Sequence, residues 1–322
     1  MRDTERKPLP PPFVGEGVLT RPDFKFMTTR QVCLAPIADI LRFRHSARVQ
    51  TRHSGEFVST EYEYRGLLAQ AWDLLRGDTT NWPDRVFYQT IVELGSGPAL
   101  DVGCGTGRLM LDYLAAGLDV DGVDNSPEML AICRTKASRM GLDVSGRLFE
   151  QEMAALFLER RYATILVPSS SFQLLTDPLA ADRAMAGFVQ HLAPGGVLVM
   201  SIMSKLWPWR RVPPQMQWSY WHMLAERLRP EDGTTIRRWI RERYDHVEQL
   251  AHEESRYEVV RDNIVVQTEM HGRSPSTRWY SQAQARTFFE TVGFTSVSVT
   301  SGFTFEPASF ADTTFCVLGT RS

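Results

Sequence analysis

Helical and strand-like patterns of apolar residues follow one another through the middle of the chain. Apolar residues at helical spacing from Tyr64 to Leu75 predict a helix that ends before Gly77, and a second helix is predicted over 83–94. Beyond these, short apolar runs alternate with helical patterns. The predicted strands are 98–102, 120–123, 146–149, 162–168 and 197–203, and the predicted helices are 107–116, 126–140 and 177–192. Five such alternations predict an α/β fold, with a doubly wound, Rossmann-like parallel sheet.

The rest of the chain has a different pattern. Residues 204–278 are mostly strand-like, and alternation over 264–270 predicts a half-buried strand after a turn at 261–263. A helix is predicted over 281–292, and two closing strands over 297–300 and 314–318 complete a seven-stranded sheet. We therefore expect an antiparallel insertion over 204–280 after the fifth strand, which together with the helical segment from Tyr64 forms a lid over the substrate.

The first 60 residues lack such periodicity. Prolines gather near the start and arginines over 42–52, with one short helix predicted near 37–43. We interpret 1–60 as a weakly ordered extension and 61–322 as the folded domain. A basic arm that contacts a partner is the alternative interpretation.

Composition narrows the function. The 322 residues include 36 Lys and Arg against 38 Asp and Glu, a net charge of −2, so nothing favours nucleic acid as a partner. We expect no membrane span and no signal peptide, because no apolar run is long enough and the first residues are polar. Four dispersed cysteines lack metal-ligand spacing and suggest a reducing, cytoplasmic setting.

The segment with the most specific chemistry is a glycine-rich turn between the first predicted strand and its helix. Gly103, Gly105 and Gly107 follow Asp101, and glycine lets the backbone approach a ligand closely. The helix that follows offers free N–H groups to a polar group. At the end of the second strand lies Asp124, where a carboxylate can accept both hydroxyls of an adenosine ribose. Together these features predict a nucleoside-containing ligand.

The turn differs from two other nucleotide-binding motifs. Arg108 occupies the position of the third glycine of the dinucleotide fingerprint, and no Gly-Lys-Ser/Thr is present. Instead, Leu-Asp-Val-Gly-Cys-Gly-Thr-Gly over 100–107 resembles motif I of the class I S-adenosylmethionine-dependent methyltransferases. Four further segments agree with that family's motifs: 123–130, 151–153, 168–175 and 192–199. The closing strands after Gly293 also agree.

The resemblance implies a cofactor, S-adenosylmethionine, and a set of residues that bind it. Gly103, Cys104 and Gly105 would line its methionine part, with Asp101 supporting the loop or the amino group. Asp124 would bind the ribose. The remaining residues assigned to the cofactor border the adenine or end the fourth strand: Asn125, Met129, Glu152, Met153, Pro168 and Ser169. Glu152 departs from the family, where Asp is commoner.

The acceptor should lie beyond the fourth strand and under the lid. We expect it to contact Tyr64, Trp72, Ser170, Phe172 and Tyr280. Ser169-Ser170-Ser171 replaces the Asn/Asp-Pro-Pro-aromatic motif of DNA and glutamine-amide methyltransferases, which argues against those acceptors. The arrangement resembles the glycine and aminosugar N-methyltransferases and favours a small-molecule acceptor, an amine rather than a hydroxyl.

Several alternatives stay open from the sequence alone. The basic, Trp-containing run over 237–243 would suit an RNA or protein methyltransferase, and a non-catalytic cofactor-binding protein would share the same motifs. Four tryptophans over 207–221 form either an acceptor wall or a contact between subunits of a homo-oligomer. No catalytic base is identified, because His252 and His271 are at strand positions where hydrogen-bonded or surface histidines are more common.

Overall fold

The computed structural model describes residues 64–204 and 217–322. The chain divides into two compact units, 1–53 and 54–322, and all described residues belong to the second. The predicted extension over 1–60 and the short helix near 37–43 lie outside the described residues. Within the described residues, no helix has the length and apolar character needed to cross a membrane.

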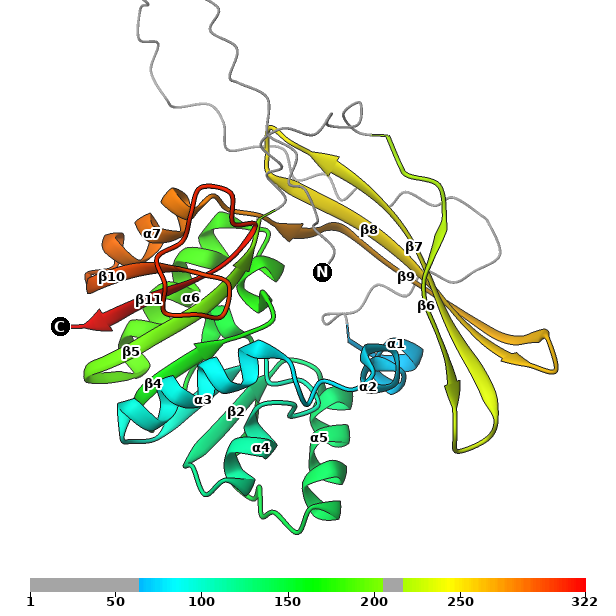
Figure 1. Cartoon of the computed structure of the whole chain (residues 1–322), viewed down its shortest axis with the longest axis horizontal. Coiled ribbons are helices and arrows are strands. Elements are labelled where there is room, and N and C mark those ends of the chain that lie inside the picture. Colours follow the sequence, from blue (N-terminus) through cyan, green and yellow to red (C-terminus); the bar gives the residue numbers. More distant parts are fainter. Residues whose placement is uncertain (1–63, 205–216) are drawn as a thin grey trace, which may run out of the picture. The chain divides into compact units, whose positions relative to one another are not determined.

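A seven-stranded sheet forms the centre of the second unit (Figure 1). Its order is β10-β11-β5-β4-β1-β2-β3, in which β3, β2, β1, β4 and β5 are parallel while β11 runs antiparallel to both neighbours. The strands are β1 (Ala99–Val102), β2 (Val120–Asp124), β3 (Leu148–Glu150), β4 (Tyr162–Val167), β5 (Leu192–Met203), β10 (Phe294–Ser301) and β11 (Thr314–Arg321). The predicted doubly wound sheet with its closing hairpin is confirmed.

Helices cover both faces of this sheet, because its strands alternate buried side chains between two cores. Leu166 of β4 faces α3 (Pro83–Gly95) and α4 (Met110–Ala115). Its neighbours Ile165 and Val167 face α6 (Pro178–His191) and α7 (Gln282–Thr291). On the first face, α5 (Pro127–Arg139) packs against α4. The α5 N-terminus is capped by Ser126, whose Oγ accepts a 3.1 Å bond from the Met129 N–H.

Several predicted boundaries differ from the structure, and three of them concern the segments around the glycine turn, the first helix and β5. The first predicted helix is two short helices, α1 (Gly66–Gln70) and α2 (Trp72–Arg76), separated at Ala71. The helix predicted from residue 107 begins only at Met110, because the glycine turn continues through Leu109. The turn at Pro194-Gly195-Gly196 is part of β5, where a register shift against β4 absorbs it.

The insertion forms a four-stranded antiparallel sheet, as predicted. Its order is β6-β7-β8-β9, with β6 (His222–Arg229), β7 (Thr234–Asp245), β8 (Leu250–Arg261) and β9 (Ile264–Arg278). Asp262 and Asn263 form the β8–β9 turn, both with positive φ. The prediction that 264–270 is half-buried is wrong at its start, where Ile264, Val265 and Val266 are all exposed. The apolar cluster that packs on α1 and α2 takes its strand residues from β7 and β8, and β9 is an edge strand.

One buried side chain joins the two sheets. Gln173, in the short 3₁₀ turn η2 (Ser171–Leu174), accepts a 2.8 Å bond from the N–H of Met203 at the end of β5. Its amide nitrogen donates to the carbonyls of Met203 and Arg278, both at 3.0 Å. Gln173 thus holds the two ends of the insertion against the loop that follows β4.

Candidate active site

A cleft of about 720 Å³ lies where β1, β2 and β4 end. This is the edge at which doubly wound sheets bind ligands, because the loops after neighbouring parallel strands separate there. Three kinds of segment enclose it: the glycine turn after β1, the lid helices α1 and α2, and the inner face of the four-stranded sheet. Of the sixteen residues assigned from the sequence, fourteen line this cleft.

The glycine turn is held against β2. The N–H groups of Gly103 and Cys104 both donate to the carbonyl of Val123, at 2.8 and 3.1 Å. Gly103 has φ +74°, and a Cβ there would lie 2.8 Å from Ser171 Oγ. Gly105 has φ +54°, and a Cβ there would meet no atom within 4 Å. The turn therefore leaves open space beside Gly105 at the cleft, where a ligand can approach the backbone.

Asp124 links the end of β2 to the glycine turn and to α5. Its Oδ2 accepts a 2.9 Å bond from the Gly105 N–H, and its Oδ1 accepts a 2.9 Å bond from the Ser126 N–H. Burial raises the pKa of this carboxyl despite those bonds. Because a carboxylate has about four lone-pair sites, two acceptor sites remain for a ligand in the cleft.

Asp101, at β1, has a buried oxygen without a hydrogen-bond partner. Its side chain is 1% exposed, and Oδ1 has no partner among the described residues. Burial raises the pKa of Asp101 to about 7. A buried carboxyl oxygen without a donor is costly, so this atom is suited to a cationic or N–H group that a ligand brings.

Four residues border the far end of the cleft. Met129 is buried at the first turn of α5, and Met153 is half-buried in the short turn η1 (Met153–Ala155). Asn125 Nδ2 donates a 3.1 Å bond to Glu152 Oε1. Two apolar thioethers beside an amide and a carboxylate form a slot suited to a flat heterocycle with polar edges.

The loop after β4 has a constrained backbone. Ser169 and Ser170 both have left-handed φ, +53° and +61°, a conformation that non-glycine residues rarely adopt in succession. Ser171 Oγ stabilises the turn by donating a 2.7 Å bond to the Pro168 carbonyl. Ser170 Oγ is buried and has no hydrogen-bond partner in the described part of the chain. The loop thus presents Ser169 and Ser170 to the cleft.

Two residues expected to contact an acceptor lie in the core instead. Phe172 is fully buried between Tyr280 and Phe288, with ring centroids 5.9 and 5.5 Å away. Tyr280 is 4% exposed and packs on Phe288 at 5.0 Å. Neither lines the cleft, because the 3₁₀ turn directs residue 172 toward α7.

Helices α1 and α2 are fastened to α5 and to the glycine turn. Glu128 Oε2, in the first turn of α5, accepts a 2.7 Å bond from the Gly66 N–H. Asp73 accepts a 2.7 Å bond from Thr106 Oγ1 and pairs with Lys136 at 2.9 Å. Tyr64 and Trp72 line the cleft and pack edge to face, 4.9 Å apart.

The opposite wall comes from β7, β8 and β9. Arg238 donates a 2.7 Å bond to Glu253 Oε1, which also accepts a 2.7 Å bond from Ser255 Oγ. His271 lines the same wall, and its Nε2 lies 2.6 Å from Glu269 Oε1. His252 is not at the cleft: its Nδ1 lies 2.7 Å from Ser274 Oγ, and burial lowers its pKa.

Several further residues line the cleft that the local sequence pattern does not single out. Arg76 ends a helix, where cations are ordinary, and Glu253 and Arg238 lie in strands whose pairing only the fold reveals. Two signals were available: Arg238 belongs to the basic run over 237–243, and alternation places 253 and 255 on one face of β8.

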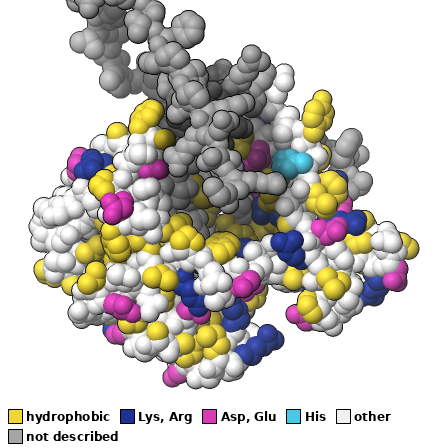
Figure 2. Space-filling view, in the orientation of Figure 1, with side chains coloured by type: hydrophobic (Ala, Val, Ile, Leu, Met, Phe, Trp, Pro, Cys, Tyr) yellow, Lys and Arg dark blue, Asp and Glu magenta, His cyan; other side chains and the backbone are white. Residues whose placement is uncertain are grey.

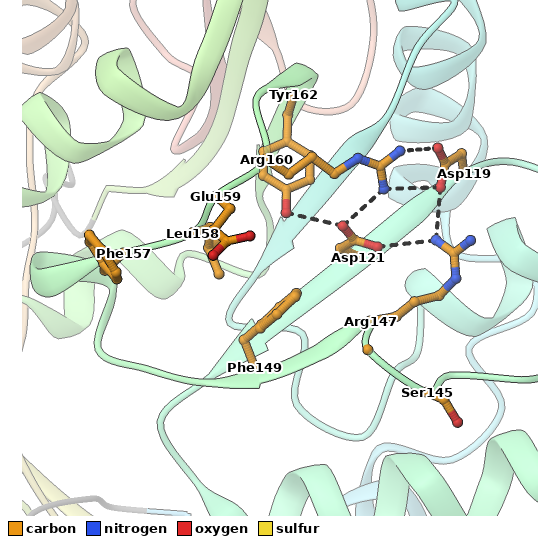
Figure 3. Close-up of a pocket in the computed structure, with 11 residues that line it drawn as sticks. Asp119, Asp121, Ser145, Arg147, Phe149, Phe157, Leu158, Glu159, Arg160 and Tyr162 are labelled. Carbon is orange, nitrogen blue, oxygen red and sulfur yellow. Dashed lines mark hydrogen bonds and ion pairs between the residues drawn. The ribbon is translucent and has the colours of Figure 1, made fainter.

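A second cavity of about 720 Å³ lies at the other edge of the sheet, where β2 and β4 begin (Figure 3). Arg147 bridges Asp119 and Asp121 at 2.8 and 3.1 Å, and Arg160 pairs with the same two carboxylates. Tyr162 Oη donates a 3.1 Å bond to Asp121. The two arginines and two aspartates of this cavity neutralise one another, whereas the cleft contains the buried Asp101 oxygen without a partner among the described residues.

Comparison with known proteins identifies the family of the central segment. Residues 99–196 match the family model described as a methyltransferase domain. The chain is 31% identical over 124 residues to a ubiquinone biosynthesis O-methyltransferase of Xanthomonas euvesicatoria, covering 38% of this chain and 50% of that protein. It is 29% identical over 154 residues to a dTDP-3-amino-3,6-dideoxy-α-D-glucopyranose N,N-dimethyltransferase of Streptomyces fradiae, covering 46% and 58%. The chain thus spans little more than half of these relatives.

The fold is similar over a longer stretch. A sugar N-methyltransferase from Streptoalloteichus superposes with a TM-score of 0.61 at 17% identity, covering 84% of this chain and 98% of that one. At this identity the likeness concerns the fold alone. The family match shows a methyltransferase domain over residues 99–196, and the superposition shows that the chain has a methyltransferase fold.

Proposed function

We propose that this protein transfers a methyl group from S-adenosylmethionine to a small-molecule amine. The observation that carries the proposal is the division of one cleft into two halves. Asp101, the glycine turn and Asp124 form one half, and the inner face of the four-stranded sheet with the lid helices forms the other. A cofactor and an acceptor that share this cleft would be enclosed together.

The first half fits the cofactor's polar groups. Asp101 Oδ1 needs a donor, which the ammonium of the methionine part would supply. The open space at Gly105 admits a chain running along the backbone. Asp124 retains two acceptor sites after its bonds to Gly105 and Ser126, enough for two ribose hydroxyls.

The second half fits an amine. Glu253 is the carboxylate that the four-stranded sheet contributes to the lining of the cleft. Its Oε1 is held by Arg238 and Ser255, which fixes the orientation of the group, while Oε2 has no hydrogen bond to a described residue. An amine bound at Oε2 would lie on the acceptor wall of the cleft.

The protein's contribution to the reaction would be positional. S-adenosylmethionine carries an activated methyl on a sulfonium, and transfer is an in-line displacement by the acceptor's lone pair. Glu253 would orient the amine and take up its proton. Ser169 and Ser170 would border the acceptor, and Tyr64 and Trp72 would exclude water from above.

The alternative acceptor, RNA, receives less support. Three arginines of the basic run pair with glutamates across the sheet: Arg237 with Glu226, Arg238 with Glu253 and Arg241 with Glu254. On the face shown in Figure 2, basic and acidic side chains are interspersed rather than gathered by sign. Arginines that are already paired with glutamates neutralise few phosphates and therefore displace few counterions from an RNA backbone. This weakens the electrostatic contribution to RNA binding.

An acceptor screen tests the proposal. Purified protein is incubated with S-adenosylmethionine and pools of amines, hydroxyl metabolites, bulk RNA or protein, and S-adenosylhomocysteine release is measured. We expect release with amines that include amino acids and aminosugars. Release only with RNA or protein would replace the small-molecule acceptor. Cofactor binding without release in any pool would favour a non-catalytic binding protein.

A further inference from the structure

The last residue of α2, Arg76, has a guanidinium held between two indole rings at the cleft. Its Cζ lies 4.9 Å from the ring centroid of Trp72 and 5.0 Å from that of Trp82. Its Nη2 donates a 3.4 Å bond to Ser169 Oγ, in the loop after β4. Two cation–π contacts stabilise the guanidinium at the cleft without neutralising its charge.

No carboxylate among the described residues lies within ion-pair distance of Arg76. The acids near it already have partners: Asp73 is shared by Thr106 and Lys136, and Asp84 pairs with Arg108. Arg108 itself lies 5.2 Å from the Trp82 centroid, on the same stack, and adds repulsion. Burial, followed by this repulsion, lowers the pKa of Arg76. The described residues therefore supply no counterion for the charge of Arg76.

We propose that Arg76 binds a carboxylate which a ligand brings into the cleft. The proposal rests on the proposed function. A carboxylate matches the planar guanidinium by forming two parallel charge-assisted hydrogen bonds, which a hydroxyl or a carbonyl oxygen cannot do. The cleft also contains Asp101, whose orphan oxygen needs a cation. One amino-acid group, with an ammonium and a carboxylate, would satisfy both.

Two ligands of the proposed reaction can carry such a carboxylate. One is the methionine part of the cofactor, and the other is an amino-acid acceptor such as glycine. Both ligands would present the same group, a carboxylate, to Arg76, so the experiment must show which ligand supplies it. Three adenosine compounds do this: S-adenosylhomocysteine, its decarboxylated analogue, and 5′-methylthioadenosine, which lacks both the carboxylate and the ammonium.

Binding of each compound is measured by calorimetry for the wild type, Arg76→Gln, Arg76→Lys and the control Arg183→Gln, an exposed arginine on α6. If the cofactor supplies the carboxylate, Arg76→Gln should bind S-adenosylhomocysteine about ten- to a hundredfold more weakly. It should bind the other two compounds as the wild type does, which also shows that the variant is folded. Arg76→Lys should recover part of the loss.

If the acceptor supplies the carboxylate, S-adenosylhomocysteine affinity stays unchanged in Arg76→Gln. The KM for acceptors with a carboxylate then rises at least tenfold, while the KM for matched amines without one does not. Equal affinities and equal KM values for all compounds would overturn the proposal while leaving the proposed function intact. A wild type that binds none of the adenosine compounds would overturn the proposed function and this assignment together.

Discussion

The backbone N–H of Gly105 donates a 2.9 Å hydrogen bond to Oδ2 of Asp124. This bond joins two features that are 19 residues apart, the middle of the glycine turn and the carboxylate at the end of β2. Neither can move without the other, so the group proposed to bind ribose also sets the shape of the turn beside it. Cofactor affinity and local stability should therefore change together when the carboxylate is removed.

Asp124→Ala should weaken S-adenosylhomocysteine binding by about 1.5–3 kcal/mol, the range for hydrogen bonds to a charged group. It should also lower the melting temperature, because two N–H groups lose their acceptor. Calorimetry and thermal denaturation measure the two effects. Asp143→Ala, at an exposed aspartate before β3, is the control. Unchanged affinity in a folded Asp124→Ala variant would remove this residue from the site.

Cofactor affinity should depend on pH through Asp101. Its pKa of about 7 means that the carboxyl is largely protonated at pH 6, while an ammonium requires the ionised form. Affinity for S-adenosylhomocysteine should therefore rise from pH 6 to 8, with a limiting slope of about tenfold per pH unit well below the pKa. In Asp101→Asn, calorimetry should show an affinity that does not change with pH over this range. If the affinity of this variant rises with pH as it does in the wild type, Asp101 is not the group responsible for the pH dependence.

The same raised pKa has a consequence for the protein without ligand. An aspartate of ordinary pKa in the unfolded chain loses its proton near pH 4, whereas in the folded protein Asp101 keeps it to about 7. The folded state thus binds more protons between these values. The contribution of Asp101 to the free energy of unfolding should fall as pH rises from about 4 to 7. Urea denaturation of the wild type and Asp101→Asn, compared at pH 5 and 7, isolates this contribution.

Glu253→Gln should raise the KM for amine acceptors by about tenfold or more, because the proposed partner of the amine loses its charge. S-adenosylhomocysteine affinity should stay the same, since the contact is on the acceptor wall. Glu254→Gln is a matched control: the neighbouring residue lies on the other face of β8 and pairs with Arg241. Equal KM values for the two variants would argue against Glu253 as the amine-binding group.

Gln173→Leu should destabilise the protein by about 2–4 kcal/mol, because it leaves buried polar groups of Met203 and Arg278 without partners. Turnover should fall more than S-adenosylhomocysteine affinity, since these bonds hold the insertion rather than the glycine turn. Gln190→Leu, at an exposed glutamine of α6, should leave both unchanged. A Gln173→Leu variant with wild-type stability would show that these bonds do not hold the sheets together.

Phe172→Ala should lower the free energy of unfolding. The side chain is fully buried in the core against α7, so its loss should cost about 3–5 kcal/mol in the free energy of unfolding. Phe157→Ala, at a phenylalanine that is 84% exposed, should change it by less than about 0.5 kcal/mol. Chemical denaturation compares the two. Wild-type stability in Phe172→Ala, together with lost turnover, would return this residue to the acceptor site.

Local sequence determined the sheet and the half of the cleft that we propose binds the cofactor. Strand periodicity, the glycines and the cap at Ser126 are features of neighbouring residues, and the turn after β1 must bring Gly105 to the carboxyl end of a parallel strand. The position of Asp124 is predictable in the same way, because it ends β2, the parallel strand that pairs with β1. These positions need no knowledge of distant contacts.

Only the tertiary structure decided the acceptor half. Glu253 reaches the cleft because Gln173 and the apolar contacts of α1 hold the second sheet in place, and no local pattern encodes that docking. Phe172 was misplaced for the same reason: whether a residue just after a strand faces solvent or core depends on the helix that covers it, here α7. Arg76 ends its helix like many arginines, and no described carboxylate pairs with it because the fold assigns the nearby acids to other partners.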